Sequence, residues 1–107
     1  FDAFSPVEEG AEEIPSRTAI ASITPNPFNP QTRIRFELAE SGPVRLRVFD
    51  LRGALVRTLV DGRLNVGRHE AVWDGRSDSG GRVSSGVYFS RLEAGGLVLH
   101  GKMSLVK

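Results

Sequence analysis

From residue 19 to residue 107, apolar side chains recur at every second position, and this period of two constrains the fold more than any other feature. The clearest example is the alternation of Ile34, Phe36 and Leu38 with charged residues. A strand places successive side chains on opposite faces, so one face of such a segment covers a core and the other meets solvent. No segment shows a convincing helical period. We therefore predict an all-β protein.

Turn-forming residues divide this region into about seven short strands. The predicted strands cover 20–24, 33–38, 44–48, 55–60, 69–73, 87–92 and 97–106. We expect 33–38 and 44–48 to form an antiparallel pair, because a short break at Ser41-Gly42-Pro43 separates them. Neither parity of 55–60 is uniformly apolar, which favours an edge strand or a bulge, and Asp61-Gly62 is expected to begin the next connection. The pattern predicts a two-sheet antiparallel sandwich.

The first 18 residues differ in composition and are predicted to be an acidic linker that precedes a domain at 19–107. Five of the 13 acidic residues lie before residue 14, whereas all 14 basic residues lie after it. An alternative is that Phe1, Phe4 and Val7 dock onto the domain. The chain begins with Phe1 and lacks a positively charged leader followed by an apolar stretch, so we interpret it as a fragment or a processed product.

Residue types that carry chemistry are sparse in this sequence. Cysteine is absent, which excludes disulfides and thiolate metal sites. A triad of Ser77, His69 and Asp74 would place His69 and Asp74 on opposite faces of one strand, and no Gly-x-Ser-x-Gly motif is present. We predict a non-enzymatic protein without a cofactor. No apolar run approaches 18 residues, so no transmembrane segment is expected.

Two further groups have both a functional and a structural interpretation. Asp74 and Asp78 resemble part of a calcium loop, but Arg76 occupies the place of a third oxygen ligand, which favours a structural turn. Weak calcium binding is left open. Trp73 and Tyr88 could form a sugar-stacking platform, as in a carbohydrate-binding accessory module of a secreted hydrolase. A lone Trp in a small sandwich is favoured as a core residue.

Four arginines alternate on two strands that we expect to be neighbours, and they would share one outward face: Arg33, Arg35, Arg45 and Arg47. Such a basic patch could bind a polyanion, such as a glycolipid or an acidic partner surface. The alternative is a solvated face that acidic neighbours partly neutralise. Nucleic acid is disfavoured as a partner, because Phe49 is the one aromatic residue on that parity.

Five motifs occur in an order that resembles a known family. They are Pro25-Asn26-Pro27-Phe28-Asn29-Pro30, Val48-Phe49-Asp50-Leu51-Arg52-Gly53, Trp73-Asp74-Gly75, Ser85-Gly86-Val87-Tyr88-Phe89 and Lys102-Met103-Ser104-Leu105-Val106-Lys107. Over roughly residues 22–107 the chain resembles the C-terminal sorting domain of type IX secretion and its relative, the immunoglobulin-like domain of the flagellar hook-capping protein. The resemblance implies an immunoglobulin-like β-sandwich.

The resemblance also implies a function, namely a non-catalytic C-terminal domain that directs a larger protein to the bacterial cell surface. Its partners would be a secretion-machinery protein, an upstream catalytic or adhesive domain of the same chain and, in some members, a surface glycolipid. The expected location is secreted or cell-surface, reached through the periplasm and the outer membrane. The alternative within the same resemblance is a flagellar hook-capping type of assembly domain.

The rigid proline segment and the last strand are the candidate recognition elements. The residues are Pro25, Asn26, Pro27, Phe28, Asn29, Pro30, Lys102 and Lys107. Three prolines restrict the backbone of the segment, which lowers the entropy lost when it docks onto a partner. The alternative is a corner that merely ends the first strand.

Overall fold

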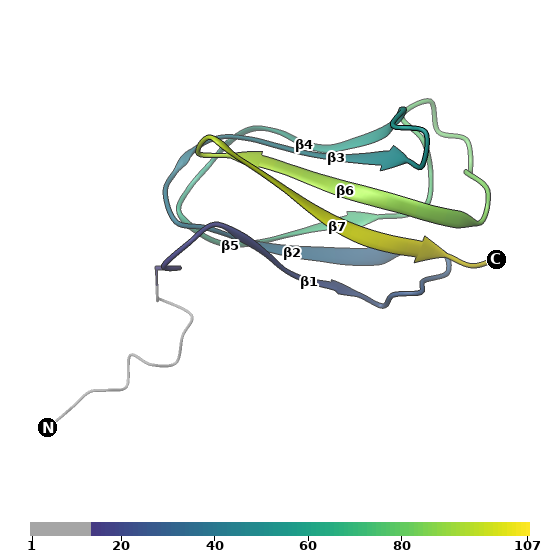
Figure 1. Cartoon of the computed structure of the whole chain (residues 1–107), viewed down its shortest axis with the longest axis horizontal. Helices are drawn as coiled ribbons and strands as arrows, with labels where there is room; N and C mark the ends of the chain where they lie inside the picture. Colours follow the sequence, from purple (N-terminus) through teal and green to yellow (C-terminus); the bar gives the residue numbers. More distant parts are fainter. Residues whose placement is uncertain (1–13) are drawn as a thin grey trace, which may run out of the picture.

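The computed structural model describes residues 14–107, which form seven strands in two antiparallel sheets (Figure 1). The strands are β1 (Ala19–Thr24), β2 (Thr32–Leu38), β3 (Gly42–Asp50), β4 (Leu55–Leu64), β5 (Gly67–Trp73), β6 (Gly86–Ala94) and β7 (Leu97–Leu105). The predicted all-β, two-sheet antiparallel sandwich is confirmed. Within residues 14–107 there is no helix of the length and hydrophobicity needed to cross a membrane. The alternative docking of Phe1, Phe4 and Val7 lies outside the described residues.

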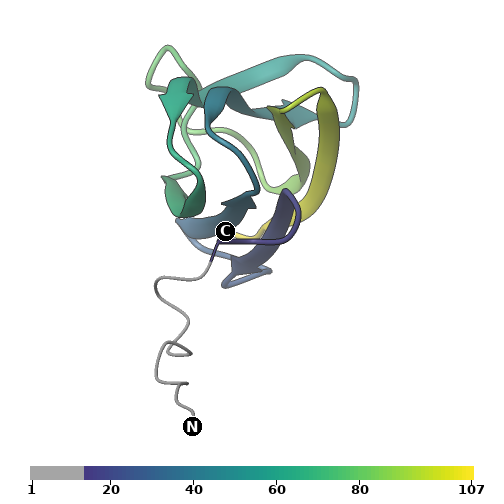
Figure 2. The same cartoon turned by 90° about the vertical axis from the view of Figure 1, so that its left-hand side faces the viewer.

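One sheet has the strand order β1-β2-β5 and the other has the order β4-β3-β6-β7. The predicted pairing of 33–38 with 44–48 is therefore wrong, because β2 and β3 belong to different sheets. Alternation shows that each strand has an apolar face, but it does not distinguish strands that pair from strands that face each other across a core. The connection from Leu38 to Gly42 carries the chain from one layer to the other. Figure 2 shows the two layers end on.

The core lies between the sheets and takes its side chains from the alternating positions. It contains Phe28, Ile34, Phe36, Leu38, Val44, Leu46, Val48, Trp73, Tyr88, Leu92, Ala94, Met103 and Leu105. All lie on strands except Phe28, which comes from the proline segment. Burial of each large side chain stabilises the fold by about 1.5–3 kcal/mol before the entropy cost of folding is counted.

Strand β4 is an edge strand with two register shifts against β3, as its mixed sequence pattern predicted. It continues through Asp61 and Gly62, however, and ends at Leu64. The prediction that Asp61-Gly62 begins a connection is wrong. Polar residues and glycine are tolerated there because one side of an edge strand faces solvent.

The residues just before β1 contact the sandwich. Pro15 is buried, and the hydroxyl of Thr18 accepts a hydrogen bond from the backbone N–H of Ala39 (3.1 Å). The predicted linker boundary at residue 18 stays a prediction. Strand β1 also contacts β7, so the first and last strands lie side by side (Figure 2).

Candidate recognition surface

The proline segment packs along the free edge of β7, so the structure brings the two candidate recognition elements together. The backbone N–H of Phe28 donates to Ser104 O (2.9 Å), and the N–H of Val106 donates to Phe28 O (3.0 Å). Asn26 Nδ2 donates to Lys102 O (2.9 Å), and Asn26 Oδ1 accepts from the N–H of Ser104 (3.0 Å). We call residues 25–30 and 102–107 together the corner surface.

Most predicted recognition residues on the corner surface are exposed, namely Pro25, Asn26, Pro27, Asn29, Pro30, Lys102 and Lys107. Phe28 differs, because it is 2% exposed and its ring lies 5.5 Å from that of Trp73. The predicted recognition role of Phe28 stays a prediction, and any such role would have to involve its backbone or its effect on the shape of the segment. Its side chain anchors the segment in the core, and the neighbouring residues remain at the surface.

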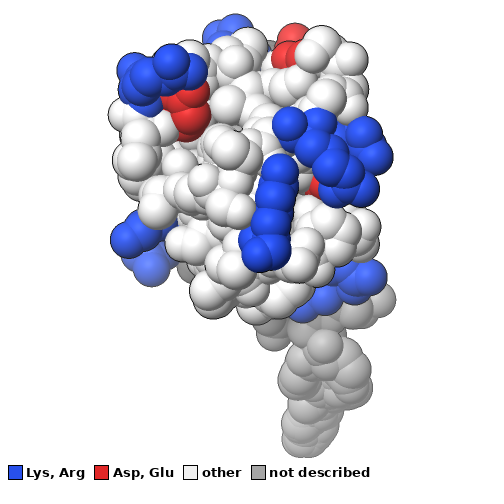
Figure 3. Space-filling model, turned by 90° about the vertical axis from the view of Figure 1, so that its right-hand side faces the viewer, with Lys and Arg blue, Asp and Glu red and all other residues white. Residues whose placement is uncertain are grey.

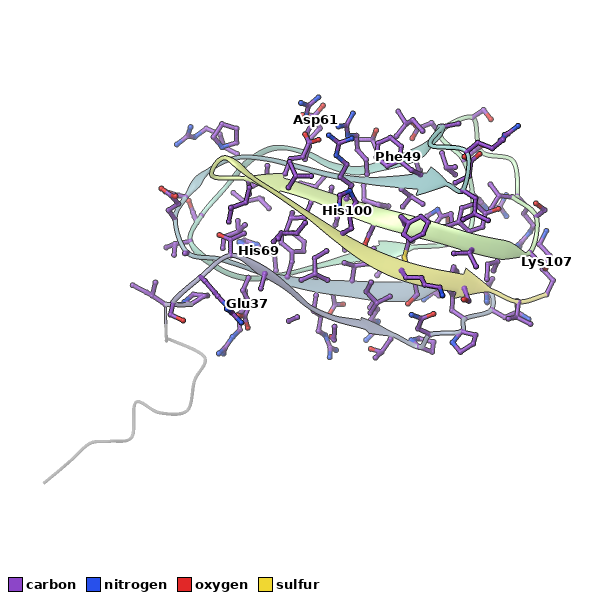
Figure 4. The ribbon with its side chains drawn as sticks, in the orientation of Figure 1. Glu37, Phe49, Asp61, His69, His100 and Lys107 are labelled. Carbon is purple, nitrogen blue, oxygen red and sulfur yellow. The ribbon has the colours of Figure 1, made fainter. Side chains whose placement is uncertain are left out.

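The corner surface lies at the end of the molecule where the chain reaches Lys107 (Figure 4). Viewed from that end, basic side chains outnumber acidic ones (Figure 3). A hollow of about 110 Å³ lies between the proline segment and the turn after β5. It is lined by Asn29, Pro30, Asp74, Gly75, Arg82, Leu105 and Lys107. The corner surface therefore presents exposed prolines beside exposed lysines.

The turn after β5 supports this end of the molecule. Gly75 is buried with φ of +78°, and a Cβ placed there would lie 3.1 Å from Pro30 O. Asp74 Oδ1 accepts from the N–H of Arg76 (3.1 Å), and Trp73 Nε1 donates to Arg76 O (2.9 Å). The Trp73-Asp74-Gly75 motif thus has a structural explanation, because only glycine adopts this backbone conformation without strain.

The candidate calcium loop uses its carboxylates for structural bonds. Asp78 Oδ1 accepts from the N–H of Thr58 on β4 (3.0 Å), and Arg57 lies 3.9 Å from both Asp74 and Asp78. No group of three or more metal-ligating side chains is found among residues 14–107. These bonds support the structural-turn interpretation.

The four predicted patch arginines do not form one patch. Arg33 and Arg35 lie on β2 and Arg45 and Arg47 lie on β3, so the two pairs point outward from opposite sheets. The predicted single face is wrong for the same reason as the predicted strand pairing. On the three-stranded sheet, Glu70 lies 3.8 Å from Arg33 and 3.1 Å from Arg35.

On the four-stranded sheet, Glu93 is the centre of a larger ionic cluster. Arg47 Nη2 donates to Glu93 Oε2 (2.8 Å), Arg91 Nε lies 2.8 Å from the same oxygen, and Arg45 Nη2 lies 3.2 Å from Oε1. Burial alone would raise the pKa of Glu93, but the hydrogen bond and charge of Arg47, then the charges of Arg91 and Arg45, hold this pKa below its ordinary value.

Asp50 is a second carboxylate whose pKa is lowered, here at the β3–β4 turn. The main cause is the hydrogen bond from the N–H of Ala54 (3.0 Å), followed by the guanidinium of Arg52 (3.1 Å). The carboxylate stabilises the turn by accepting backbone donors. The motif from Val48 to Gly53 thus has a structural explanation too.

The proposed sugar platform of Trp73 and Tyr88 does not exist at the surface. Trp73 is 0% exposed and Tyr88 is 6% exposed, and their rings meet edge to face with centroids 5.2 Å apart. The favoured interpretation of Trp73 as a core anchor is confirmed. His69 stacks on Phe36 and its Nε2 lies 2.7 Å from Asn65 O, whereas the hydroxyl of Ser77 lies 2.9 Å from that of Ser79.

Sequence reasoning missed two features. The contact of Asn26 with β7 joins positions 76 and 78 residues apart and has no local signal. The second missed feature is the cluster of Arg91 and Glu93. Unlike the Asn26 contact, it had a local signal, because the alternation of the predicted strand 87–92, continued to residue 93, places both side chains on the outward face. A systematic comparison of parities would have placed them on one face with Arg45 and Arg47, had the order of the strands been known.

Comparisons with known proteins agree with the fold. Dimeric latent PorU from Porphyromonas gingivalis is similar with a TM-score of 0.65 and 23% identity, and the match covers 79% of this chain and 9% of PorU. PorZ from the same organism has a TM-score of 0.57 and 19% identity, with coverage of 80% of this chain and 11% of PorZ. FlgD from P. aeruginosa has a TM-score of 0.53 and 18% identity, with coverage of 85% of this chain and 67% of FlgD. PorZ is described as an essential bacterial surface component of the type IX secretion system. The chain thus spans about a tenth of the length of PorU and PorZ.

Comparison of the sequence with curated proteins and with family models identifies the family. No curated protein sequence matches the chain. The model of the FlgD Ig-like domain family matches residues 22–96, from within β1 to the turn between β6 and β7. Its span covers most of the sandwich just described. The chain therefore belongs to the FlgD Ig-like domain family.

Proposed function

We propose that this domain is a non-catalytic sorting and anchoring module that directs a larger protein to the bacterial cell surface. The observation that carries the proposal is the union of the two predicted recognition elements in the corner surface. Asn26 and Phe28 fasten the proline segment to the edge of β7, so a partner meets both elements in one fixed geometry. Fixing a surface before binding lowers the entropy lost on association.

The partner in this proposal is a protein of the secretion machinery, and the cargo is a catalytic or adhesive domain upstream in the same chain. Residues 1–18 serve as the acidic linker between cargo and domain. Some members of the resembled family also acquire a surface glycolipid, which makes a glycolipid a further partner. The similarity of fold to PorU and PorZ supports this direction, since PorZ is itself a component of a type IX system.

The test is a fusion of residues 19–107 to a periplasmic reporter in a bacterium with type IX secretion. Deleting residues 102–107 would be uninformative, because Met103 and Leu105 are core residues. We instead replace Lys102 and Lys107 together with glutamine. Both side chains lie at the surface, so the fold should persist while surface delivery falls at least about 10-fold, since flexible cations on a docking surface mainly affect recognition.

The control replaces Arg63 with glutamine, because Arg63 is also exposed but lies on β4, at the opposite edge of the four-stranded sheet from β7. It should leave surface delivery unchanged. Circular dichroism of the purified variants would establish that each is folded. Unchanged delivery of the folded double variant, or loss of delivery in the control, would contradict the proposal.

A flagellar assembly domain is the second candidate, and the family match favours it. The FlgD structure is also the one of the three comparison structures that this chain covers extensively, at 67% of its length. This function would require an upstream segment that binds hook or rod subunits. Complementation of a hook-capping deletion by the complete protein, without surface delivery of the fusion, would favour it over sorting.

A further inference from the structure

The outer face of the four-stranded sheet carries aromatic and cationic side chains in adjacent rows. Phe49 on β3 pairs with Phe89 on β6, and Arg47 pairs with Arg91 in the next row of the same face. His100 on β7 pairs with Arg91 in turn. Residues paired across antiparallel strands project from the same face. We call these five residues the cationic aromatic patch, and Figure 4 labels Phe49 and His100 within it.

The patch is organised although its charges repel. Two arginines directly opposite each other destabilise a sheet. Here the guanidinium carbons of Arg47 and Arg91 lie 5.3 and 5.6 Å from the ring centroid of Phe49, and Glu93 contacts both. Contact with the ring and with the carboxylate offsets the repulsion and fixes both guanidinium groups.

Part of the donor capacity of the patch is unused. The imidazole of His100 has no polar partner among residues 14–107, and the Arg91 side chain, whose Nε lies 2.8 Å from Glu93 Oε2, is 37% exposed. A hollow of about 280 Å³ is lined there by Phe49, Phe89, Arg91 and His100, among others. A larger hollow of about 570 Å³, lined by Arg45, Glu93 and Val98 among others, lies on the same sheet. The larger hollow lies within the size range of small-ligand sites, and the hollow beside the patch is slightly smaller.

The position of the patch restricts what can bind. An extended peptide that adds a strand needs free backbone groups, and on β3 and β6 these groups are used by neighbouring strands on both sides. A ligand on this face therefore meets side chains alone. Its chemistry must offer a flat apolar surface for the phenylalanines and a carboxylate for the arginine, as a sugar ring that bears an acid group does.

We propose that the cationic aromatic patch binds an acidic oligosaccharide built from uronic acid units. Arg91 and His100 contact the carboxylates, and the Phe49–Phe89 pair packs against the face of a sugar ring. Arg47 contacts the Phe49 ring directly and shares the Glu93 carboxylate with Arg91, so it positions both without needing to contact the ligand. This site differs from the sequence-predicted platform, whose Trp73 is buried. Lys102 of the corner surface pairs with Phe89 and borders the patch, but the ligand contacts proposed here come from Arg91, His100 and the two phenylalanines.

Isothermal titration calorimetry with tetragalacturonate and the intact chain tests the site, with maltotetraose as the neutral ligand of equal length. We expect saturable binding of the acidic ligand and none of the neutral one. Arg91→Gln should weaken binding at least about 10-fold, because a charge-assisted pair is lost. His100→Ala should weaken it about 3-fold, and Arg17→Gln, with the same change of charge as Arg91→Gln, less than 2-fold.

Folding is controlled by the choice of variants. Arg91→Gln alters contacts with Glu93 and Phe49, whereas His100→Ala removes a side chain without a polar partner among residues 14–107, so weaker binding in a fully folded His100→Ala protein separates recognition from stability. Absence of saturable binding, equal weakening by Arg17→Gln, or equally tight binding of oligoglutamate or single-stranded DNA would each overturn the proposal. The last two results would indicate general attraction of polyanions.

Discussion

The side-chain amide of Asn26 acts toward Ser104 as a peptide group of a neighbouring strand would. Its Oδ1 accepts from the backbone N–H of Ser104 (3.0 Å), and its Nδ2 donates to Lys102 O two residues earlier (2.9 Å). Proline has no backbone N–H to donate, and the segment contains prolines on both sides of Asn26. The side chain therefore extends the ladder where the main chain cannot.

Replacing Asn26 with alanine should lower the free energy of unfolding by about 1–2 kcal/mol, because two hydrogen bonds to β7 are lost at an exposed edge that water reaches. Urea denaturation followed by circular dichroism would measure the change. Asn29→Ala is the matched control, since Asn29 lies in the same segment and is exposed. Equal destabilisation by the two substitutions would show that the amide of Asn26 has no special role.

Replacing Phe28 with alanine should cost about 3–5 kcal/mol, as expected for a buried aromatic residue next to Trp73. Val106→Ala, at an exposed apolar position beside it, should change the free energy of unfolding by less than about 0.5 kcal/mol. Thermal unfolding would compare the stabilities of the Phe28→Ala and Val106→Ala variants. A stable Phe28→Ala protein that failed in surface delivery would indicate that Phe28 takes part directly in recognition.

Gly75→Ala should destabilise the domain by about 1–2 kcal/mol, because a side chain is strained at φ of +78°. Gly81→Ala is the control, since no heavy atom lies within 4 Å of the added Cβ and its φ is not in the left-handed region. Both variants can be compared by urea denaturation. Similar stabilities would argue that the Trp73-Asp74-Gly75 turn relaxes without cost.

Stability should fall in acid, and Glu93 should account for part of the fall. The folded-state pKa of Glu93 lies below its ordinary value of 4.5, so its ionic cluster stabilises the fold above that pH and loses its contribution as the pH falls through the folded pKa. Glu93→Gln should be less stable than the native protein at pH 7, and the difference should narrow toward pH 3, since a protonated Glu93 resembles glutamine. A constant difference across this range would contradict the role assigned to the cluster.

The positions of the strands could be predicted from the sequence better than the pairing between strands. Trp73 was predicted to end a strand and to lie in the core, because a lone tryptophan in a small sandwich is usually buried. Both predictions were confirmed. The pairing of 33–38 with 44–48 failed because Ile34 and Leu46 are buried equally well whether their strands pair or face each other. The basic patch failed with it.

The residues of the candidate site could be predicted from the sequence, but the contacts that bring them together could not. Exposed prolines and terminal lysines can be recognised from composition and position. Nothing local indicates that Asn26 bonds to β7 or that Phe28 turns inward, because both depend on the path of a chain 76 or more residues away. The aromatic partner of Phe49 was missed for the same reason, since Phe89 lies on a strand whose neighbour was unknown.

The contact between Asn26 and Lys102 also has a kinetic consequence. Its two ends are separated by 76 positions, so closing this loop carries a large entropic cost before any contact compensates for it. Sandwiches that depend on such distant contacts fold slowly, on the scale of milliseconds to seconds. The proline segment and β7 acquire their joint shape only when most of the chain has folded, so an unfolded precursor would not present this shape to any receptor.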